Sequence, residues 1–160
     1  GQTFKEPEVR LQKSGAKIMS LQQPTKKMSK TDSPDSCIGL FEEPAETKAK
    51  IMKAVTDTGK AVKYDPKKKP GISNLLTIYS LLSGKTVKEV ERKFKKKGYA
   101  DFKKSLAELT VNSLEPLRKK RKELLSREVY VREILSQGQK RAKNLAQSTL
   151  QDVKKKMGLM

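Results

Sequence analysis

From residue 44 onward, apolar residues recur every three or four positions, which is the spacing of one helix face. Pro44 suits the first turn of a helix, and Ile51, Met52 and Val55 give that helix an apolar stripe that ends before residues 57–59. The prolines of residues 64–71 predict a loop. A second helix follows the loop and ends at residues 83–84. Its dense apolar face predicts the centre of the core: Ile72, Leu75, Leu76, Ile78, Tyr79 and Leu82.

The later helices are predicted from a cap and from the same spacing. Thr86 and Glu89 have the spacing of a capping box, which opens a helix that ends at Gly98. Another helix is predicted around Pro116, which would kink or restart it. The remainder, about 118–157, is predicted as one long helix or as two helices interrupted at Gly138.

The first 43 residues have a different pattern. Two short apolar groups, residues 17–21 and 37–41, are predicted as short strands joined by a lysine-rich loop. Two such strands are too little for an independent domain. The pattern as a whole therefore predicts a mainly α fold, a helical bundle preceded by a short strand-containing segment.

Composition narrows the chemistry. The 160 residues include 37 Lys and Arg against 18 Asp and Glu, and the resulting charge of +19 favours a polyanionic partner. The chain has no histidine, which excludes serine–histidine nucleophiles, histidine metal ligands and histidine acid–base catalysis. The single Cys37 forms no disulfide framework and is typical of a cytoplasmic protein. No apolar run could span a bilayer, and the start at Gly1 without a leader indicates a processed or shortened chain.

The loop over residues 24–32 carries the most specific chemistry. It places the ammonium groups of Lys27 and Lys30, two hydroxyls and several backbone amides on a short connection between apolar segments. Such a loop suits a triphosphate, because lysine can follow phosphate oxygens as negative charge moves onto the leaving pyrophosphate. On composition alone, a solvated basic turn is the simpler interpretation.

Residues 27–31, Lys-Met-Ser-Lys-Thr, resemble the Lys-Met-Ser-Lys-Ser signature of class I aminoacyl-tRNA synthetases. Residues 15–21, Gly-Ala-Lys-Ile-Met-Ser-Leu, resemble the Gly-Ala-Arg-Ile-Met-Ser-Leu run of bacterial tryptophanyl-tRNA synthetases. Residues 54–57, 69–76 and 157–159 resemble the same subfamily, so the similarity covers nearly all of residues 3–159 in order. It is specific to the tryptophan enzymes rather than to their tyrosine relatives.

The resemblance implies roles for the loop. Lys27 and Lys30 would be catalytic and would contact the ATP phosphates, and Ile18 would lie near the adenine. Met28 and Ser29 would shape the loop over the nucleotide. Thr31 replaces the last serine of the signature and keeps its hydroxyl, which leaves the geometry of loop closure open.

The resemblance also implies the organisation of the chain. Residues 1–43 would be the C-terminal remnant of a Rossmann-like α/β catalytic domain, residues 44–116 a helical anticodon-binding domain, and residues 117–160 helices that pack back on the catalytic domain. Without that domain, we expect exposed apolar surface, a shifted final helix or self-association, because the apolar residues of the last helices lack their usual partner: Ile134, Leu145, Leu150 and Val153.

The parent enzyme implied by the resemblance is a cytoplasmic homodimer that activates tryptophan with ATP and Mg²⁺ and transfers it to its tRNA. The family's His-Ile-Gly-His signature and tryptophan pocket lie in an N-terminal half that this chain is expected to lack. The chain is therefore predicted to be inactive alone. No resident metal ion, membrane or DNA partner is expected.

Basic runs at residues 67–69, 95–97, 118–122 and 154–156 are individually typical of solvated helix faces. Together with the charge of +19 they favour RNA contact for some of them. Thr56, Asp57 and Lys63 are candidates for reading the anticodon, although residues 56 and 57 fit a helix end equally well. Asn74 is either a buried hydrogen-bonding residue or an RNA contact. The alternative function is a stand-alone basic helical module that binds RNA without catalysis, which would leave the lysine loop unexplained.

Overall fold

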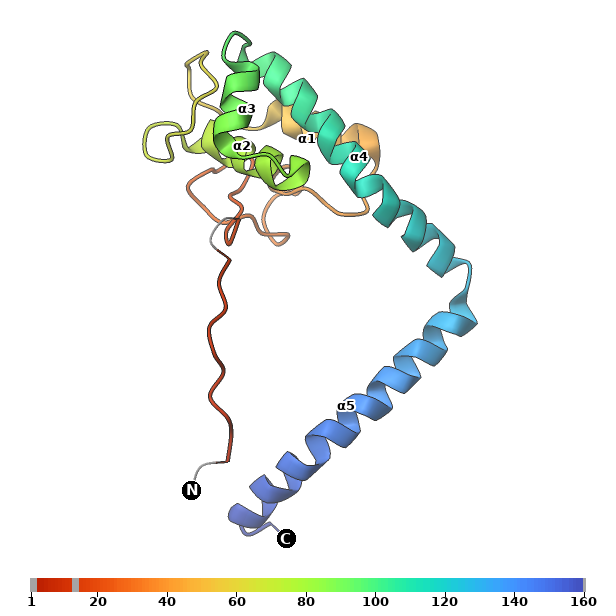
Figure 1. Ribbon diagram of the computed structural model, residues 1–160. Coiled ribbons are helices and arrows are strands. Elements are labelled where there is room, and N and C mark those ends of the chain that lie inside the picture. Colours follow the sequence, from red (N-terminus) through yellow and green to blue (C-terminus); the bar gives the residue numbers. More distant parts are fainter. Residues whose placement is uncertain (1–2, 13–14, 160) are drawn as a thin grey trace. The chain divides into compact units, whose positions relative to one another are not determined.

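Figure 1 shows the computed structural model of the chain, which describes residues 3–12 and 15–159. Within these residues the chain forms five α-helices, one short 3-10 helix and no extended strand. The mainly α prediction is therefore confirmed. The elements in chain order are η1 (Pro34–Ser36), α1 (Pro44–Lys53), α2 (Pro70–Ser83), α3 (Val87–Phe94), α4 (Tyr99–Leu125) and α5 (Glu128–Lys156).

Several helix ends follow the local signals in the sequence. Helices α1 and α2 begin at prolines, and α2 ends before Gly84, whose φ of 69° is the left-handed conformation that favours glycine. The predicted capping box at the start of α3 is present. Thr86 N donates to Glu89 Oε2 at 2.8 Å, and Glu89 N donates to Thr86 Oγ1 at 3.4 Å.

One alternative predicted for each of the two long helices is wrong. Pro116 does not restart a helix, because α4 continues through it to Leu125. Gly138 does not interrupt α5, and the break lies at residues 126–127 instead. A single glycine costs a helix only about 1 kcal/mol, whereas the Ser126 hydroxyl donates to the Glu123 carbonyl at 2.7 Å and competes with the helical pattern. The helix predicted to end at Gly98 also ends earlier, at Phe94.

The predicted pair of strands at residues 17–21 and 37–41 is also wrong. Residues 37–41 form no bridge, and the described residues contain one isolated antiparallel bridge, between Met19 and Lys27. The first apolar segment therefore pairs with the lysine-rich loop itself. The pairing is local because a tight turn brings residues 18–20 and 26–28 together at little loss of chain entropy.

The chain divides into two compact units, and the larger one is Leu11–Lys119. Its core is built by α1, α2, α3 and the first part of α4. Leu21, which comes just before the lysine-rich loop, is fully buried among these helices. Three aromatic rings, those of Tyr79, Phe94 and Phe102, lie with their centroids 5.1–5.8 Å apart. The lysine-rich segment is thus packed on the helices rather than on a sheet.

The other unit combines Gly1–Arg10, of which residues 3–10 are described, with Lys120–Met160, of which residues 120–159 are described. Helix α5 has no buried residue. Ile134, Leu145 and Leu150 are exposed, as expected, and Val153 is half-buried. In the part of the chain that the structure describes, no helix is both long and apolar enough to cross a membrane.

Candidate functional site

The lysine-rich segment folds as a small hairpin, defined here as residues 18–28. Ser20 N donates to Lys26 O and Met28 N donates to Ile18 O, both at 2.8 Å. These two bonds flank the bridge between Met19 and Lys27. The backbone of Lys27 is therefore fixed opposite Met19, and its side chain is exposed.

The tip of the hairpin is closed by a buried hydroxyl. Ser20 Oγ accepts hydrogen bonds from the backbone of Gln22 at 3.2 Å and of Gln23 at 3.1 Å, and Lys26 N donates to Gln23 O. Serine satisfies the amides of a turn in this way at many chain reversals. These bonds close the turn within its own residues.

The hairpin is tied to the helices at two of its residues. Asn74 of α2 hydrogen-bonds both backbone groups of Met19: its Oδ1 accepts from Met19 N at 2.8 Å and its Nδ2 donates to Met19 O at 2.7 Å. Two residues on, Val55 N donates to Leu21 O, and Leu21 N donates to Ser36 O. Asn74 is buried, so of its two predicted roles the structure supports the buried hydrogen-bonding residue rather than the RNA contact.

The residues after the hairpin carry the second lysine. Ser29 Oγ and Thr31 Oγ1 lie 2.7 Å apart, and Thr31 N donates to Ser29 Oγ at 3.3 Å. The threonine that departs from the family signature therefore keeps a hydroxyl contact within the loop. Lys30 and Thr31 are exposed, while Ile18, Met28 and Ser29 are half-buried.

The six residues predicted to bind nucleotide thus form one continuous patch with an inner and an outer part. Ile18 and Met28 pack against the core, and Lys27 and Lys30 extend into solvent. Within residues 3–12 and 15–159, neither ammonium group has an ion pair or hydrogen bond. The arrangement can present two positive charges to a polyanion, and the backbone that carries Lys27 is supported by the core.

A hollow of about 410 Å³ lies beside the hairpin. Residues of the hairpin and of the start of α2 line it, whereas Lys27 and Lys30 do not. Its walls come from Lys17, Met19, Pro24, Thr25, Tyr64, Pro66, Pro70, Ser73, Asn74 and Thr77.

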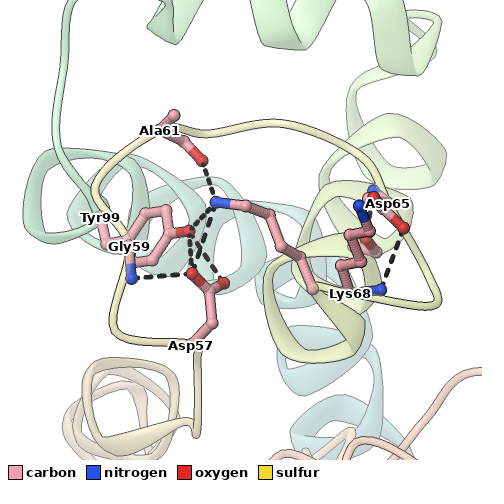
Figure 2. A network of polar contacts seen from close by, with 8 residues as sticks. Asp57, Gly59, Ala61, Asp65, Lys68 and Tyr99 are labelled. Atoms are coloured by element: carbon pink, nitrogen blue, oxygen red, sulfur yellow. Dashed lines mark hydrogen bonds and ion pairs between the residues drawn. The ribbon is translucent and has the colours of Figure 1, made fainter.

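The candidates for anticodon reading lie on the loop between α1 and α2, where Asp57 is the centre of a polar network (Figure 2). Asp57 Oδ1 accepts from Gly59 N at 2.8 Å, and both carboxylate oxygens accept from the Tyr99 hydroxyl at 2.9 Å. Lys69 Nζ donates to Asp57, to the carbonyl of Ala61 and to the Tyr99 hydroxyl. The carboxylate thus joins the loop to the first turn of α4.

This network sets the charge states of its members. Burial opposes ionisation of Asp57, but the hydrogen bonds from Tyr99, Gly59 and Lys69 outweigh it and lower the pKa of the carboxyl. The hydrogen bond to Tyr99 and the nearby carboxylate raise the pKa of Lys69 against the effect of burial. Thr56 is half-buried and Lys63 is exposed, and neither takes part in these bonds.

The structure also distinguishes basic side chains that are bonded within the fold from those that are exposed. Lys69 belongs to the Asp57 network, and Arg118 is turned inward, where its Nη2 donates to Val111 O at 2.6 Å and pairs with Glu115 at 3.0 Å. The other members of the basic runs are all exposed: Lys67, Lys68, Lys95, Lys96, Lys97, Lys119, Lys120, Arg121, Lys122, Lys154, Lys155 and Lys156. In the described residues no group of three or more carboxylate or cysteine side chains could hold a metal ion.

Sequence reasoning left the role of Asn74 open and did not foresee those of Ser20 and Lys69. For Asn74 a signal was available, because a polar residue stands in the middle of the apolar face of α2. Nothing in a run of three lysines distinguishes the one that turns inward.

Comparison with known proteins identifies relatives of this chain. Residues 1–115 match the family model of class I tRNA synthetases for tryptophan and tyrosine. The tryptophan–tRNA ligase of Caldanaerobacter subterraneus is 48% identical over 161 residues, which cover all of this chain and 49% of the relative. The tryptophan–tRNA ligase of Bacillus subtilis is 46% identical, over 98% of this chain and 47% of the relative.

Solved structures agree with these relatives. The tryptophanyl-tRNA synthetase of Mycoplasma pneumoniae superposes with a TM-score of 0.80 at 31% identity, over 93% of this chain and 45% of that one. The Campylobacter jejuni enzyme, solved with ADP and tryptophan, gives a TM-score of 0.67 at 29% identity, over 95% of this chain and 46% of that one.

The family model, the relatives and the solved structures thus define a class I aminoacyl-tRNA synthetase chain. It belongs to the tryptophanyl-tRNA synthetase family. The chain spans about half the length of the curated relatives it matches.

Proposed function

We propose that this chain is part of a tryptophan–tRNA ligase, in which it supplies the loop that acts on the ATP phosphates. The observation that carries the proposal is the hairpin. It supports the backbone at Lys27 and Met28, where signature residues 27–31 begin, and both lysine side chains of the signature are exposed. The relatives of the chain are tryptophan–tRNA ligases.

In the proposed mechanism, the tryptophan carboxylate attacks the α-phosphate of ATP, and pyrophosphate leaves with the electrons of the broken P–O bond. Lys27 and Lys30 stabilise the negative charge that grows on this leaving group. Their contribution is greatest where the interaction is stronger in the transition state than with bound ATP. Ile18 contacts the adenine, while Met28, Ser29 and Thr31 shape the loop over the nucleotide. Mg²⁺ takes part as the complex with ATP.

The proposal divides the enzyme between two halves. Residues 1–43 complete the catalytic domain, residues 44–116 bind the anticodon arm, and residues 117–160 pack back on the catalytic domain. The half that binds tryptophan and carries the family's histidine signature lies outside this chain, which has no histidine. The chain alone is therefore inactive, and the whole ligase works as a cytoplasmic homodimer.

Tryptophan-dependent exchange of pyrophosphate into ATP tests this proposal. The full-length ligase should catalyse the exchange with tryptophan and not with tyrosine, and the 160-residue chain should show no turnover above background. Turnover by the 160-residue chain alone would contradict the division between the halves. Exchange by the full-length protein with tyrosine alone would contradict the assignment of its substrate.

The same proposal assigns the exposed basic residues to tRNA. Lysines on the loop between α1 and α2 and on the later helices contact phosphates and position the RNA, while Thr56, Asp57 and Lys63 are candidates to contact the anticodon bases. Lys63 is supported by its exposure. Asp57 is hydrogen-bonded to Tyr99 and Lys69, so the structure supports a role for Asp57 in holding the shape of this loop rather than in contacting a base.

A further inference from the structure

The side chain of Asn74 commits its whole amide group to one residue of the hairpin. Its Oδ1 accepts from Met19 N at 2.8 Å, and its Nδ2 donates to Met19 O at 2.7 Å, across 55 positions of sequence. Asn74 is buried on α2, between core residues Leu75 and Leu76 and the buried Ser73. A two-point amide clamp of this kind fixes both the distance and the orientation of the backbone that it holds.

Met19 is the residue that bridges Lys27. The bonds between Ser20 N and Lys26 O and between Met28 N and Ile18 O lie on either side of this bridge. A displacement of Met19 relative to α2 is therefore transmitted to the backbone of Lys27 through two short hydrogen bonds. Asn74 is thus connected to Lys27 through one intervening residue, Met19, which lies opposite Lys27 in the hairpin.

Lys30 lies beyond this path. It follows Met28, the last paired residue of the hairpin, and the side-chain bonds around it are the local bonds between Ser29 and Thr31. The backbones of the two lysines are therefore held differently. That of Lys27 is joined to α2 through Met19 and Asn74, whereas that of Lys30 lies in a segment whose side-chain hydrogen bonds are all local.

We propose that Asn74 is a positioning residue for the reaction, which holds the Lys27 ammonium in register with α2. This inference rests on the proposed function of Lys27 at the ATP phosphates. Placement matters because errors of about 1 Å in catalytic groups can lower rates by as much as about 10²-fold. Asn74 touches no substrate in this proposal and acts through Met19 and Lys27.

The test compares variants of the full-length ligase in tryptophan-dependent ATP–pyrophosphate exchange, with kcat expressed per titrated active site. Asn74→Ala should lower kcat about 10-fold, with the KM for tryptophan unchanged. Asn74→Asp keeps the acceptor for Met19 N but places a buried carboxylate oxygen against Met19 O, so it should lower kcat at least as much as Asn74→Ala. Titration of active sites removes the share of any loss that comes from unfolded protein.

Thr77→Ala is the matched control. Thr77 lies on the next turn of α2 and lines the same hollow, and its hydroxyl donates to Ser73 O of its own helix at 2.9 Å. This variant should keep kcat within about twofold of the wild type, because it leaves the clamp on Met19 intact. A loss equal to that of Asn74→Ala would overturn the proposal.

A double-mutant cycle separates positioning from general structural damage. In a Lys27→Met background, Asn74→Ala should lower kcat by less than about twofold. In a Lys30→Met background, it should lower kcat about 10-fold, as it does in the wild type. Equal factors in both backgrounds, or a wild-type kcat for Asn74→Ala itself, would overturn the role of Asn74. If Lys27→Met alone retained the wild-type kcat, the proposed function of Lys27 would be what failed.

Discussion

Lys69 and Arg118 stand in basic runs of the sequence, yet both charges are used inside the fold. Lys69 reaches Asp57, Tyr99 and the carbonyl of Ala61, and Arg118 reaches the carbonyl of Val111. Such residues contribute to the charge of +19 without being available to an RNA. At the scale of single residues, the bonding partners of each side chain therefore decide which charges can bind a polyanion.

The Asp57 network predicts a loss of stability in acid. The folded-state pKa of Asp57 is lowered, so its contribution is complete above the unfolded value of about 3.9 and is lost as the pH falls below it. Asp57→Asn should reduce the stability near pH 7 and make the unfolding midpoint less dependent on pH below about 4. Denaturant unfolding at a series of pH values measures both effects.

Asp32→Asn is the control for this experiment, because Asp32 is an exposed carboxylate of the same charge. It should leave both the midpoint near pH 7 and its decline in acid close to those of the wild type. An Asp57→Asn protein with a wild-type acid profile would show that the network with Tyr99 and Lys69 contributes nothing to folding.

The sequence predicted single residues well where a local motif existed. Thr86 and Glu89 form the predicted capping box, because both partners lie within one helical turn. The clamp of Asn74 on Met19 joins residues 55 positions apart, and no local pattern encodes such a pair. For the residues predicted to bind nucleotide, the resemblance to the family signature supplied the prediction, and the structure adds which of them are exposed.

At the scale of elements, the close approach of α2 to the chain after α1 depends on a glycine. A Cβ added at Gly71 would lie 2.2 Å from the backbone carbonyl oxygen of Val55 and 3.1 Å from the Cα of Thr56. Both neighbours are backbone atoms, so the clash cannot be relieved by a side-chain rotation. Glycine at this position therefore allows the first turn of α2 to pack against the loop that carries Thr56 and Asp57.

Gly71→Ala should consequently destabilise the protein by about 2–3 kcal/mol, because an added methyl group in a filled space forces the backbone to shift. Gly138→Ala is a helical control with nothing within 4 Å of the added Cβ. It should leave the stability unchanged or raise it slightly, since alanine favours helix. Thermal unfolding of the two variants gives the comparison, and a wild-type midpoint for Gly71→Ala would contradict this packing.

The end of α1 shows why element boundaries were harder to predict than element types. Lys103 of α4 donates to the carbonyls of Met52 and Ala54 at 3.2 and 2.7 Å, so the helix ends on a tertiary contact. Burial lowers the pKa of this lysine. Apolar spacing identified α1 and α2, but the strands expected at residues 17–21 and 37–41 are absent, because their segments find partners in the loop and in the core.

At the scale of the whole molecule, the proposed binding of tRNA by the exposed basic residues should be sensitive to salt. Replacing Lys67 and Lys68 together with alanine in the full-length ligase should weaken binding of the tryptophan tRNA. It should also lower the slope of log K against log salt, by up to about 0.9 for each phosphate that the protein no longer neutralises. Binding titrations at several salt concentrations measure the slope.

Lys48→Ala is the control for general charge, since Lys48 is exposed on α1 and lies outside the basic runs. It should change the slope less than the double variant does. Equal changes would show that the loop makes no particular contact with the RNA, and would count against its role in binding the anticodon arm.

The most direct test of the account concerns the two lysines themselves. In the full-length ligase, Lys27→Met and Lys30→Met should each lower the kcat of tryptophan-dependent ATP–pyrophosphate exchange by about 10²-fold, as expected for the loss of a charged group that stabilises the transition state. Lys26→Met, which removes a neighbouring exposed charge outside the signature, should stay within about threefold of the wild type. Equal rates for all three variants would contradict the assignment of this hairpin to the ATP phosphates.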